Sequence, residues 1–263
     1  MQPKFTLLRH KKQDGVSTWR VKNCCIAKHF AKPDNRREIE NYRILQSLGI
    51  PTPRLIAQGE KTLLMEDLSA GAYRLAKKKD MDHPAIAVLV AAWYRKLHEN
   101  GREYAQTHEL YDECDHITPE NLAMIGEKTG AKEYPIWPVL TERLPQIKAA
   151  AMALPRTLTY NDFNYTNFAV ARGKSAALVF DYDLLGKGYV YADIRNVCSS
   201  LGKKAKEAFL VAYGPFDESE IAVDKIASVL FTLAAACQQE KFPRWAEESL
   251  QALRGWTAED LNL

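Results

Sequence analysis

The stretch from Tyr160 to Asp183 holds the side chains of this sequence that are best suited to do chemistry. It begins Y-N-D-F-N-Y-T-N, and it places Asp162, Asn167 and Asp181 around a short predicted hairpin. Converging carboxylate and amide oxygens form a hard site, which suits magnesium holding nucleotide phosphates. Asp162 could face the same point as a base. The simpler alternative is that Asn and Asp flank this hairpin because they make turns and cap strands.

The hairpin is predicted from two apolar runs on either side of a turn. The runs are Phe168 to Ala171 and Ala176 to Phe180, and the Gly-containing turn spans residues 172–175. If the runs pair around that turn, Asn167 enters one strand opposite the point where Asp181 leaves the other. Directly opposed residues of an antiparallel pair lie roughly 4.5–5.5 Å apart, so we expect these two side chains to meet.

The pattern D-x-x-x-x-N, a hairpin and then Asp resembles the catalytic and metal-binding segments of the kinase fold. More closely, it resembles the aminoglycoside phosphotransferase and choline kinase-like family, whose loop reads H-x-D-x-x-x-x-N with a following I-D-[FWY]. The resemblance implies that Asp162 is the base that accepts or orients the proton of an acceptor hydroxyl. It implies that Asn167 and Asp181 bind Mg²⁺. Asp183 either binds a second ion or a cationic substrate, or is only a polar residue at the end of the strand.

Two charged residues of the N-terminal part fit the same family. Lys28, in the apolar run C-C-I-A-K-H-F, matches the strand lysine that reaches the ATP phosphates. Glu38 matches the helix glutamate that pairs with that lysine, and a P-x-P segment at residues 51–53 follows as it does in the family. Glu40 competes for this role, but it lies on a different face of the helix, so we favour Glu38. Ordinary exposed side chains are the alternative for both positions.

The remaining nucleotide contacts are expected from a loop and from a hinge. Gly15 occupies the turn between the first two strands, where the family has a loop over the phosphates, and Ser17 or Thr18 would donate to them. A simple hairpin turn is the alternative. The hinge, whose backbone groups would bind adenine, is expected at Met65, Glu66 and Asp67.

One departure from the family lies next to the expected base. The family histidine is replaced by Tyr160, which can keep an aromatic surface and one hydrogen bond but cannot carry positive charge near neutral pH. This puts the bracing of the loop in doubt without removing Asp162. Asp193 matches a family aspartate that we expect to brace the catalytic loop. His98 matches a Leu-His helix end and is expected to be structural.

The predicted fold class is α+β, with the two lobes of the protein kinase-like fold. Residues 1–68 read as strand, strand, strand, helix, strand, strand, a small antiparallel sheet with one helix that would bind the nucleotide. Residues 69–263 would form a larger, mainly helical lobe that carries the catalytic hairpin and the substrate. The linker is expected at residues 66–71. Beyond it, helices are expected at residues 85–99 (closed by Asn100-Gly101), 119–130, 138–154, 193–202, 205–213, 218–239 and 243–254.

Composition limits the partners. The 263 residues are 46% hydrophobic and 26% charged, with a net charge of +3. This charge is too weak to argue for nucleic acid, although it suits an anionic cosubstrate. There is no apolar stretch long enough to span a bilayer and no signal-peptide pattern at the start, so we expect no membrane partner. The five cysteines are an odd count, which fits a reducing compartment, the cytoplasm. The pair Cys24-Cys25 lies in an apolar run, so we expect it to line a buried strand rather than to form a disulfide.

The functional expectation is a Mg²⁺-dependent phosphotransferase that moves the γ-phosphoryl group of ATP to a hydroxyl of a small molecule. Candidate acceptors are choline, ethanolamine, an amino sugar or another amino alcohol. A nucleotide-binding pseudokinase without transferase activity is the alternative, and the replacement of the family histidine by Tyr160 is the observation that favours it. Protein kinase activity is disfavoured because the short stretch between Asp181 and Asp193 leaves little room for an activation loop. The sequence does not fix the acceptor, the choice of ATP over GTP, or the oligomeric state.

Overall fold

The computed structural model describes residues 4–12 and 14–263, which form two compact units. The first unit holds the described residues up to Thr107 together with Leu158–Leu185 and Asp193–Pro215. The second holds His108–Thr157, Gly186–Ala192 and Phe216–Leu263. All residues predicted to do chemistry lie in the first unit. The functional boundary expected at residue 68 stays a prediction.

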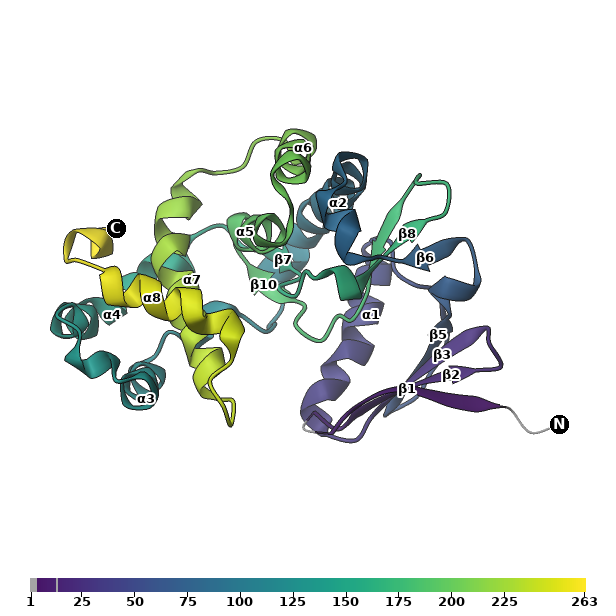
Figure 1. Cartoon of the computed structure of the whole chain (residues 1–263), viewed down its shortest axis with the longest axis horizontal. Coiled ribbons are helices and arrows are strands. Elements are labelled where there is room, and N and C mark those ends of the chain that lie inside the picture. The colour runs from purple at the N-terminus through teal and green to yellow at the C-terminus, as the bar shows by residue number, and fades with distance from the viewer. Residues whose placement is uncertain (1–3, 13) are drawn as a thin grey trace. The chain divides into compact units, whose positions relative to one another are not determined.

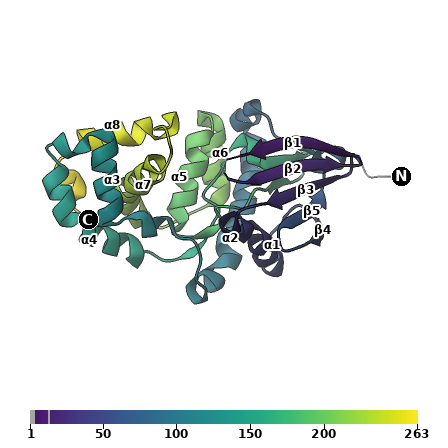
Figure 2. The same ribbon diagram turned by 90° about the horizontal axis from the view of Figure 1, so that it is seen from below.

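An antiparallel sheet of five strands opens the first unit, in the order β1-β2-β3-β5-β4 (Figures 1 and 2). The five predicted strands are confirmed. Lys28 lies opposite Thr18 on one neighbouring strand and opposite Leu63 on the other, so the lysine starts from the middle of the sheet. The strands are β1 (Phe5–Lys11), β2 (Val16–Val21), β3 (Cys25–Phe30), β4 (Leu55–Gln58) and β5 (Thr62–Glu66).

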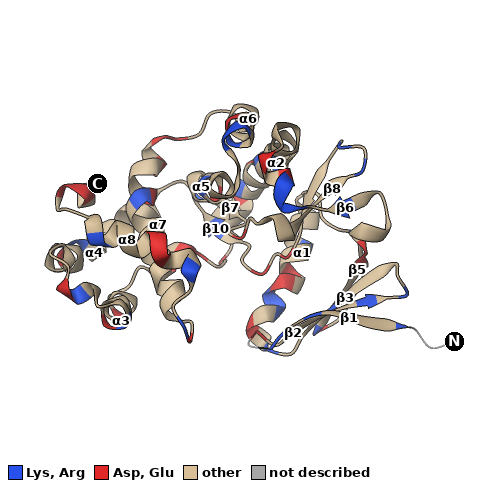
Figure 3. Ribbon diagram, viewed as in Figure 1, with Lys and Arg blue, Asp and Glu red and all other residues tan. Residues whose placement is uncertain are grey.

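Helix α1 (Arg37–Ser47) follows the sheet's third strand after a 3₁₀ turn at Pro33–Arg36. Its buried stripe includes Ile39 and Tyr42, and the helix carries charges of both signs (Figure 3). Gly49 ends the helical segment with a left-handed φ of 65°, a conformation that glycine adopts at little cost. The helix predicted in this region is confirmed.

The hairpin that is predicted to carry the site belongs to a second antiparallel sheet with the order β6-β8-β9. Strands β8 (Phe168–Ala171) and β9 (Ala177–Val179) confirm the predicted hairpin, with Phe168 opposite Val179. The prediction missed β6 (Tyr73–Leu75), which pairs with the outer edge of β8. Three residues are too few to show a sequence period, so this strand, just after the expected linker at residues 66–71, could not be recognised from the sequence.

Helix α2 (Pro84–Thr107) is longer than expected and packs against α6 (Lys203–Tyr213). We expected a stop at Asn100-Gly101, and this is wrong, because the helix continues through Gly101. A Cβ atom on Gly101 would lie 2.6 Å from the Leu158 side chain. The glycine therefore serves close packing in mid-helix rather than helix termination.

The second unit is helical around α7 (Ser219–Cys237), against which α3, α4 and α8 pack. Among its aromatic residues, Tyr189 and Trp256 are buried, while Trp245 is exposed. Among the described residues, no helix has the length and apolar character needed to cross a membrane. The remaining elements are α3 (Pro119–Thr129), α4 (Trp137–Ala153), α5 (Val190–Ser200), α8 (Glu247–Gly255), β7 (Thr157–Thr159) and β10 (Gly186–Gly188).

Candidate functional site

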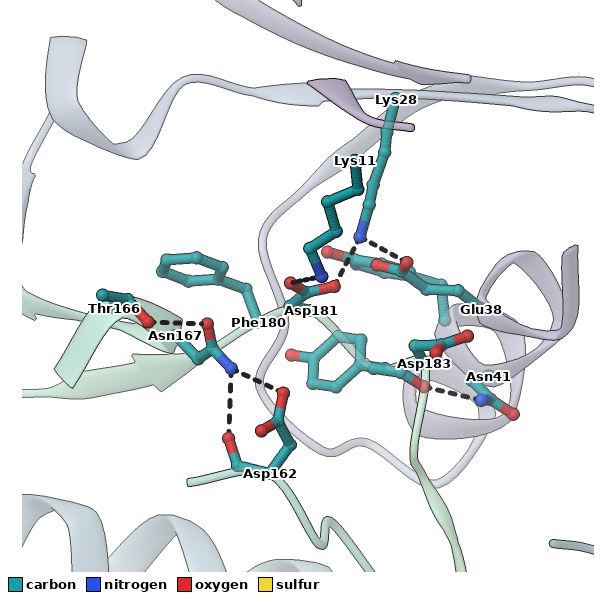
Figure 4. Close-up of polar contacts among 12 residues, drawn as sticks. Lys11, Lys28, Glu38, Asn41, Asp162, Thr166, Asn167, Phe180, Asp181 and Asp183 are labelled. Atoms are coloured by element: carbon teal, nitrogen blue, oxygen red, sulfur yellow. Dashed lines mark hydrogen bonds and ion pairs between the residues drawn. The ribbon is translucent and has the colours of Figure 1, made fainter. Parts of the chain in front are cut away.

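Lys28 of β3 contacts two carboxylates, as Figure 4 shows. Its Nζ donates to Oε2 of Glu38 on α1 and, over 2.5 Å, to Oδ1 of Asp181. The side chains of Lys28 and Glu38 are 11% and 1% exposed. The predicted pairing of Lys28 with Glu38 is therefore present, and Glu40 instead forms an exposed ion pair with Arg43.

The charges of this cluster support one another. Burial alone would lower the pKa of Lys28, but Glu38 and Asp181 outweigh it and raise that pKa above its ordinary value. Burial raises the pKa of Glu38 to about 7, against the opposing effect of Lys28. The second oxygen of Glu38 is buried and has no hydrogen-bond partner among the described residues. Because Asp181 is a second anionic partner, Lys28 keeps its charge even when Glu38 is protonated.

Asp181 leaves the hairpin with an unusual backbone conformation. Its φ is 69°, in the left-handed region that residues other than glycine seldom adopt. Lys28 faces one of its carboxylate oxygens, and Lys11 of β1 lies 3.9 Å from the other (Figure 4). Burial would raise the pKa of Asp181, but Lys28 and then Lys11 outweigh it and lower that pKa. Asp181 is therefore an anion held between two cations.

Asp162 and Asn167 form a direct hydrogen bond. Nδ2 of Asn167 donates to Oδ2 of Asp162 over 2.8 Å and to its main-chain oxygen over 3.1 Å. Oδ1 of Asn167 accepts from the Thr166 hydroxyl. Burial, and then the charge of Asp181, raise the pKa of Asp162 to about 6. Near neutral pH this carboxylate is mostly ionised but has a raised affinity for protons, as a general base requires.

The predicted register of the hairpin is wrong by one residue. Asn167 lies opposite Phe180, whose N–H donates to the Asn167 carbonyl over 2.9 Å, and not opposite Asp181. The physical reason is that the turn at residues 172–175 closes on Ala176 through the Ala171 N–H, which fixes the pairing. The positive φ of Asp181 then turns its side chain back to the cavity that Asn167 also lines.

Asp193 braces the catalytic loop, as predicted. It is fully buried, and its two oxygens accept from the backbone N–H groups of Tyr160 (2.8 Å) and Asn161 (2.9 Å). Nε2 of His98 lies 3.1 Å from Oδ2 of Asp193, and Nδ1 of His98 lies 2.7 Å from the Tyr213 hydroxyl. His98 is structural, as expected.

Tyr160 joins the catalytic loop to the hairpin. Its side chain is fully buried, and its hydroxyl donates to the carbonyl of Phe180, the residue before Asp181, over 2.7 Å. Its ring packs edge-on against Trp93 and Tyr182. The aromatic surface and the single hydrogen bond that a tyrosine can supply are therefore both in use. The replacement of the family histidine leaves a braced loop.

A cavity of about 220 Å³ collects most of the predicted residues. One part of its lining is apolar, including Ile26, Leu68 and Phe180, which suits a base ring, and another part carries the charged cluster. Asp162 does not line the cavity itself, but its carboxylate is hydrogen-bonded to Asn167, which does. The predicted residues in the lining are Lys28, Glu38, Met65, Glu66, Asp67, Asn167 and Asp181.

Gly15 and Ser17 are not among the described residues that line this cavity, whereas Thr18 is. Gly15 has a φ of 67° and accepts the N–H of Ala31 at 2.8 Å, so it sits in a tight hairpin turn. Ser17 Oγ contacts Nδ1 of His10 over 2.9 Å. The role predicted for Gly15 and Ser17 on the phosphates stays a prediction.

Two backbone N–H groups of the expected hinge are hydrogen-bonded within the protein. The N–H groups of Glu66 and Asp67 donate to the carbonyls of Arg54 and Cys24, each over 3.0 Å. The Asp67 carboxylate accepts from Arg20 at 2.6 Å. The next residue, Leu68, also lines the cavity. Sequence reasoning missed Arg9 and Arg20 in the lining, because exposed strand residues and cavity residues look alike in sequence.

The donors of the predicted metal site fit magnesium. Among the described residues, no group of three or more His, Cys, Asp or Glu is placed to hold a metal ion. Mg²⁺ does not need such a group, since it keeps several waters and is usually held by one or two carboxylates together with phosphates. Asn167 and Asp181 supply one amide and one carboxylate oxygen. Asp183 pairs with Arg37 over 3.3 Å, which leaves both interpretations of Asp183 open.

Comparison with known proteins agrees with this geometry. A family model described as the phosphotransferase enzyme family matches residues 12–223. The streptomycin–ATP complex of APH(2'')-IIa is similar at TM-score 0.65 and 16% identity, covering 99% of this chain and 94% of that one. Choline kinase LicA from Streptococcus pneumoniae gives TM-score 0.66 and 16% identity, with 96% and 94% covered.

A choline/ethanolamine kinase family protein from Mesorhizobium loti gives TM-score 0.67 and 14% identity, with 98% and 92% covered. No curated protein matches the sequence. At these identities the solved structures establish the fold, and the predicted α+β kinase-like fold is confirmed. Because the family model spans most of the sequence, this chain belongs to the phosphotransferase enzyme family.

Proposed function

We propose that this chain transfers the γ-phosphoryl group of ATP, bound with Mg²⁺, to a hydroxyl of a small molecule. One observation carries the proposal: Lys28, Glu38 and Asp181 form a single hydrogen-bonded cluster, and Asn167 of the same cavity bonds to Asp162. Phosphoryl transfer requires little more of a protein than positioning and charge stabilisation. These residues supply both.

Lys28 is the group to hold the phosphates of ATP. It is a buried cation whose pKa is raised by Glu38 and Asp181 after burial has been offset, and Glu38 fixes the direction of its side chain. Asn167 and Asp181 would hold Mg²⁺, which when bound neutralises charge on the phosphates. Asp181 would then exchange part of its contact with Lys28 and Lys11 for the metal.

Asp162 is placed to orient the acceptor hydroxyl and to take its proton. Its pKa of about 6 keeps it mostly ionised near neutral pH, and Asn167 fixes its carboxylate by donating to Oδ2. The proton would move from the hydroxyl to a free lone pair of the Asp162 carboxylate as the phosphoryl group arrives. Because the transition state is loose, orientation of the hydroxyl is the larger part of this role.

The acceptor class is proposed from the neighbours. The solved structures include a complex with streptomycin and ATP, a choline kinase, an ethanolamine kinase and a macrolide 2'-phosphotransferase. We therefore propose an amino alcohol or an amino sugar, with ATP as the donor. The alternative is a nucleotide-binding module without transfer. The bond from Tyr160 to the Phe180 carbonyl speaks against it, since the loop that carries Asp162 is braced despite the missing histidine.

An ADP-release screen tests the proposal. The wild-type protein is incubated with ATP and Mg²⁺ against a panel of choline, ethanolamine, amino sugars and other hydroxyl compounds, with Asp162→Asn as the background. Release that depends on one acceptor class, and is absent from the variant, supports a transferase. Mg²⁺-dependent stabilisation by ATP without release for any acceptor would favour the nucleotide-binding module.

A further inference from the structure

Two adjacent thiols lie at the turn between β2 and β3. Cys24 is exposed, Cys25 is half-buried, and their sulfur atoms are 3.3 Å apart. The expectation that both cysteines line a buried strand is wrong for Cys24. The reason is local: Lys22 and Asn23 take positive φ values of 51° and 58°, which makes a tight turn and keeps Cys24 outside the strand.

The pair is bonded to the segment that we expect to bind the base of ATP. The carbonyl of Cys24 accepts the N–H of Asp67 over 3.0 Å. Cys25 lies opposite Glu66 in the pairing of β3 with β5. Glu66 and Asp67 both line the cavity of the functional site. A change in the backbone at Cys24 is therefore passed directly to the wall of that cavity.

We propose that Cys24 and Cys25 form a modification site that hydroperoxides oxidise to a disulfide. In the first step the Cys24 thiol loses its proton, its thiolate attacks one oxygen of hydrogen peroxide and the O–O bond breaks. The hydroxide that leaves takes up the proton lost by the thiol, so the products are a Cys24 sulfenic acid and one water. In the second step Cys25 Sγ attacks the Cys24 sulfur and displaces the hydroxyl, which leaves as a second water with the Cys25 proton. The sulfur atoms lose two electrons in total, and the peroxide gains them.

The order of the two steps follows from exposure and hydrogen bonding. Cys24 is the exposed thiol, so the oxidant reaches it first. Cys25 is held against Cys24, and this contact is the largest cause of its raised pKa. Cys25 is therefore the less reactive thiol toward solvent but is already in place as the resolving cysteine, because its sulfur touches the one that is oxidised.

The disulfide should be easily reversed. Neighbouring Cα atoms are about 3.8 Å apart, below the usual disulfide span of about 4.4–6.8 Å. Such a bond is strained, and strained disulfides are the reducible ones. A disulfide between neighbouring residues closes a small ring that contains the peptide unit between Cys24 and Cys25. Because the Cys24 carbonyl belongs to this peptide unit, we expect it to turn and its hydrogen bond with the Asp67 N–H to weaken.

Mass spectrometry of the full-length protein tests the modification without any need for activity. Reduced protein is treated with hydrogen peroxide, free thiols are alkylated, and the peptide containing residues 24 and 25 is weighed. We expect the loss of two hydrogen atoms and no alkylation at Cys24 or Cys25, with both changes reversed by glutathione. Cys24→Ser should not form the bond, whereas Cys198→Ser, which alters another half-buried thiol, should form it normally. Full alkylation of both residues, or a lasting sulfinic acid at Cys24, would overturn the proposal.

A second arm measures the effect on nucleotide binding, and this arm rests on the proposed function. Losing one hydrogen bond corresponds to a roughly three- to tenfold weaker affinity, which we expect for Mg-ATP on the oxidised protein. The Cys24→Ser, Cys25→Ser double variant should bind equally before and after peroxide. Equal affinity of oxidised and reduced wild type would overturn the link to the cavity wall. A reduced protein that fails to bind ATP would contradict the proposed function instead, and the mass result would stand apart from it.

Discussion

Lys28 and Asp181 lie 153 positions apart in the sequence, and Nζ of the lysine donates to Oδ1 of the aspartate over 2.5 Å. This bond joins the five-stranded sheet to the end of the catalytic hairpin. Glu38 is the third member of the cluster, and it is the most buried of the three. The cluster therefore holds one cation between two carboxylates. Because all three side chains are largely buried, each charge is stabilised mainly by its partners rather than by water.

The first prediction concerns the dependence of Glu38 on Lys28. Lys28→Met leaves a buried carboxylate without its cation, which typically costs about 3–5 kcal/mol. We expect this loss in urea unfolding at about pH 8, above the Glu38 pKa of about 7, and a smaller loss below it, where Glu38 takes up a proton. Adding Glu38→Gln should recover part of the stability.

The control for Lys28→Met is Lys12→Met, which makes the same substitution at an exposed lysine in the turn after β1. It should leave the free energy of unfolding within about 0.5 kcal/mol. If the Lys28, Glu38 double variant is as unstable as the sum of the single variants, the two residues do not depend on each other.

The second prediction concerns the metal ligands. Asn167→Ala and Asp181→Ala should raise the Mg²⁺ concentration needed for ATP binding by roughly tenfold or more, measured by calorimetric titration of ATP at several metal concentrations. Asp34→Ala removes an exposed carboxylate of the same unit and should change nothing. Asp183→Ala tests whether Asp183 is a second ion ligand, since only that role would raise the Mg²⁺ requirement. A higher KM for the acceptor alone would instead indicate that Asp183 binds a cationic substrate. An unchanged Mg²⁺ requirement in both ligand variants would refute the assignment.

The third prediction concerns Tyr160. Tyr160→Phe keeps the ring but removes the hydroxyl that donates to the partly buried Phe180 carbonyl. We expect a loss of about 0.5–1.5 kcal/mol in the free energy of unfolding, as for one hydrogen bond. We also expect a lower kcat with KM for ATP little changed, because the loop that carries Asp162 loses a bond to the hairpin while Lys28 keeps its ion pair with Glu38. Tyr134→Phe, whose ring keeps its contact with Arg254, is the control. A kcat equal to that of the wild type would show that the hydroxyl does not brace the loop.

The fourth prediction is a pH dependence in the metal-free protein. The pKa of Asp162 is raised to about 6 by burial and then by Asp181, so its ionisation disfavours the folded state. Below about pH 4 the carboxyl is protonated whether folded or unfolded, and above about pH 6 the folded state carries the unfavourable charge. Asp162→Asn should therefore match the wild type in acid and be about 1–3 kcal/mol more stable above about pH 6.

Asp181→Asn gives the opposite sign in the same experiment. The pKa of Asp181 is lowered because Lys28 and Lys11 outweigh its burial, so its charge stabilises the folded state at neutral pH. That stabilisation disappears as the pH falls through the lowered pKa. Thermal unfolding of the three proteins across the pH range measures both effects, and parallel curves for all three would contradict the two pKa shifts.

The sequence was sufficient for features that repeat or alternate. The predicted order of strands and one helix in residues 1–68 agrees with the five-stranded sheet and α1, and the pairing of Lys28 with Glu38 followed from the family resemblance. The hairpin strands at Phe168 and Ala177 were found because apolar runs surround a glycine turn.

Features that depend on tertiary contacts were out of reach. The hairpin register differs from the prediction by one residue because the turn closes on Ala176. The positive φ of Asp181 nevertheless directs its side chain into the cavity. Helix α2 runs through Gly101 because Leu158, far along the chain, packs where a Cβ would lie. The N–H groups of Glu66 and Asp67 in the expected hinge are hydrogen-bonded to the backbone carbonyls of Arg54 and Cys24. No local sequence pattern reveals these bonds.

The most direct test of the proposed reaction is a comparison of wild type with Asp162→Asn, in which ATP binding and phosphoryl transfer to the acceptor found in the screen are both measured. Asp34→Asn, the same change at an exposed aspartate, serves as the control. We predict that Asp162→Asn binds Mg-ATP with nearly wild-type affinity and transfers phosphoryl at least about a hundredfold more slowly, the range expected for loss of a general base. Full turnover by Asp162→Asn would contradict the account.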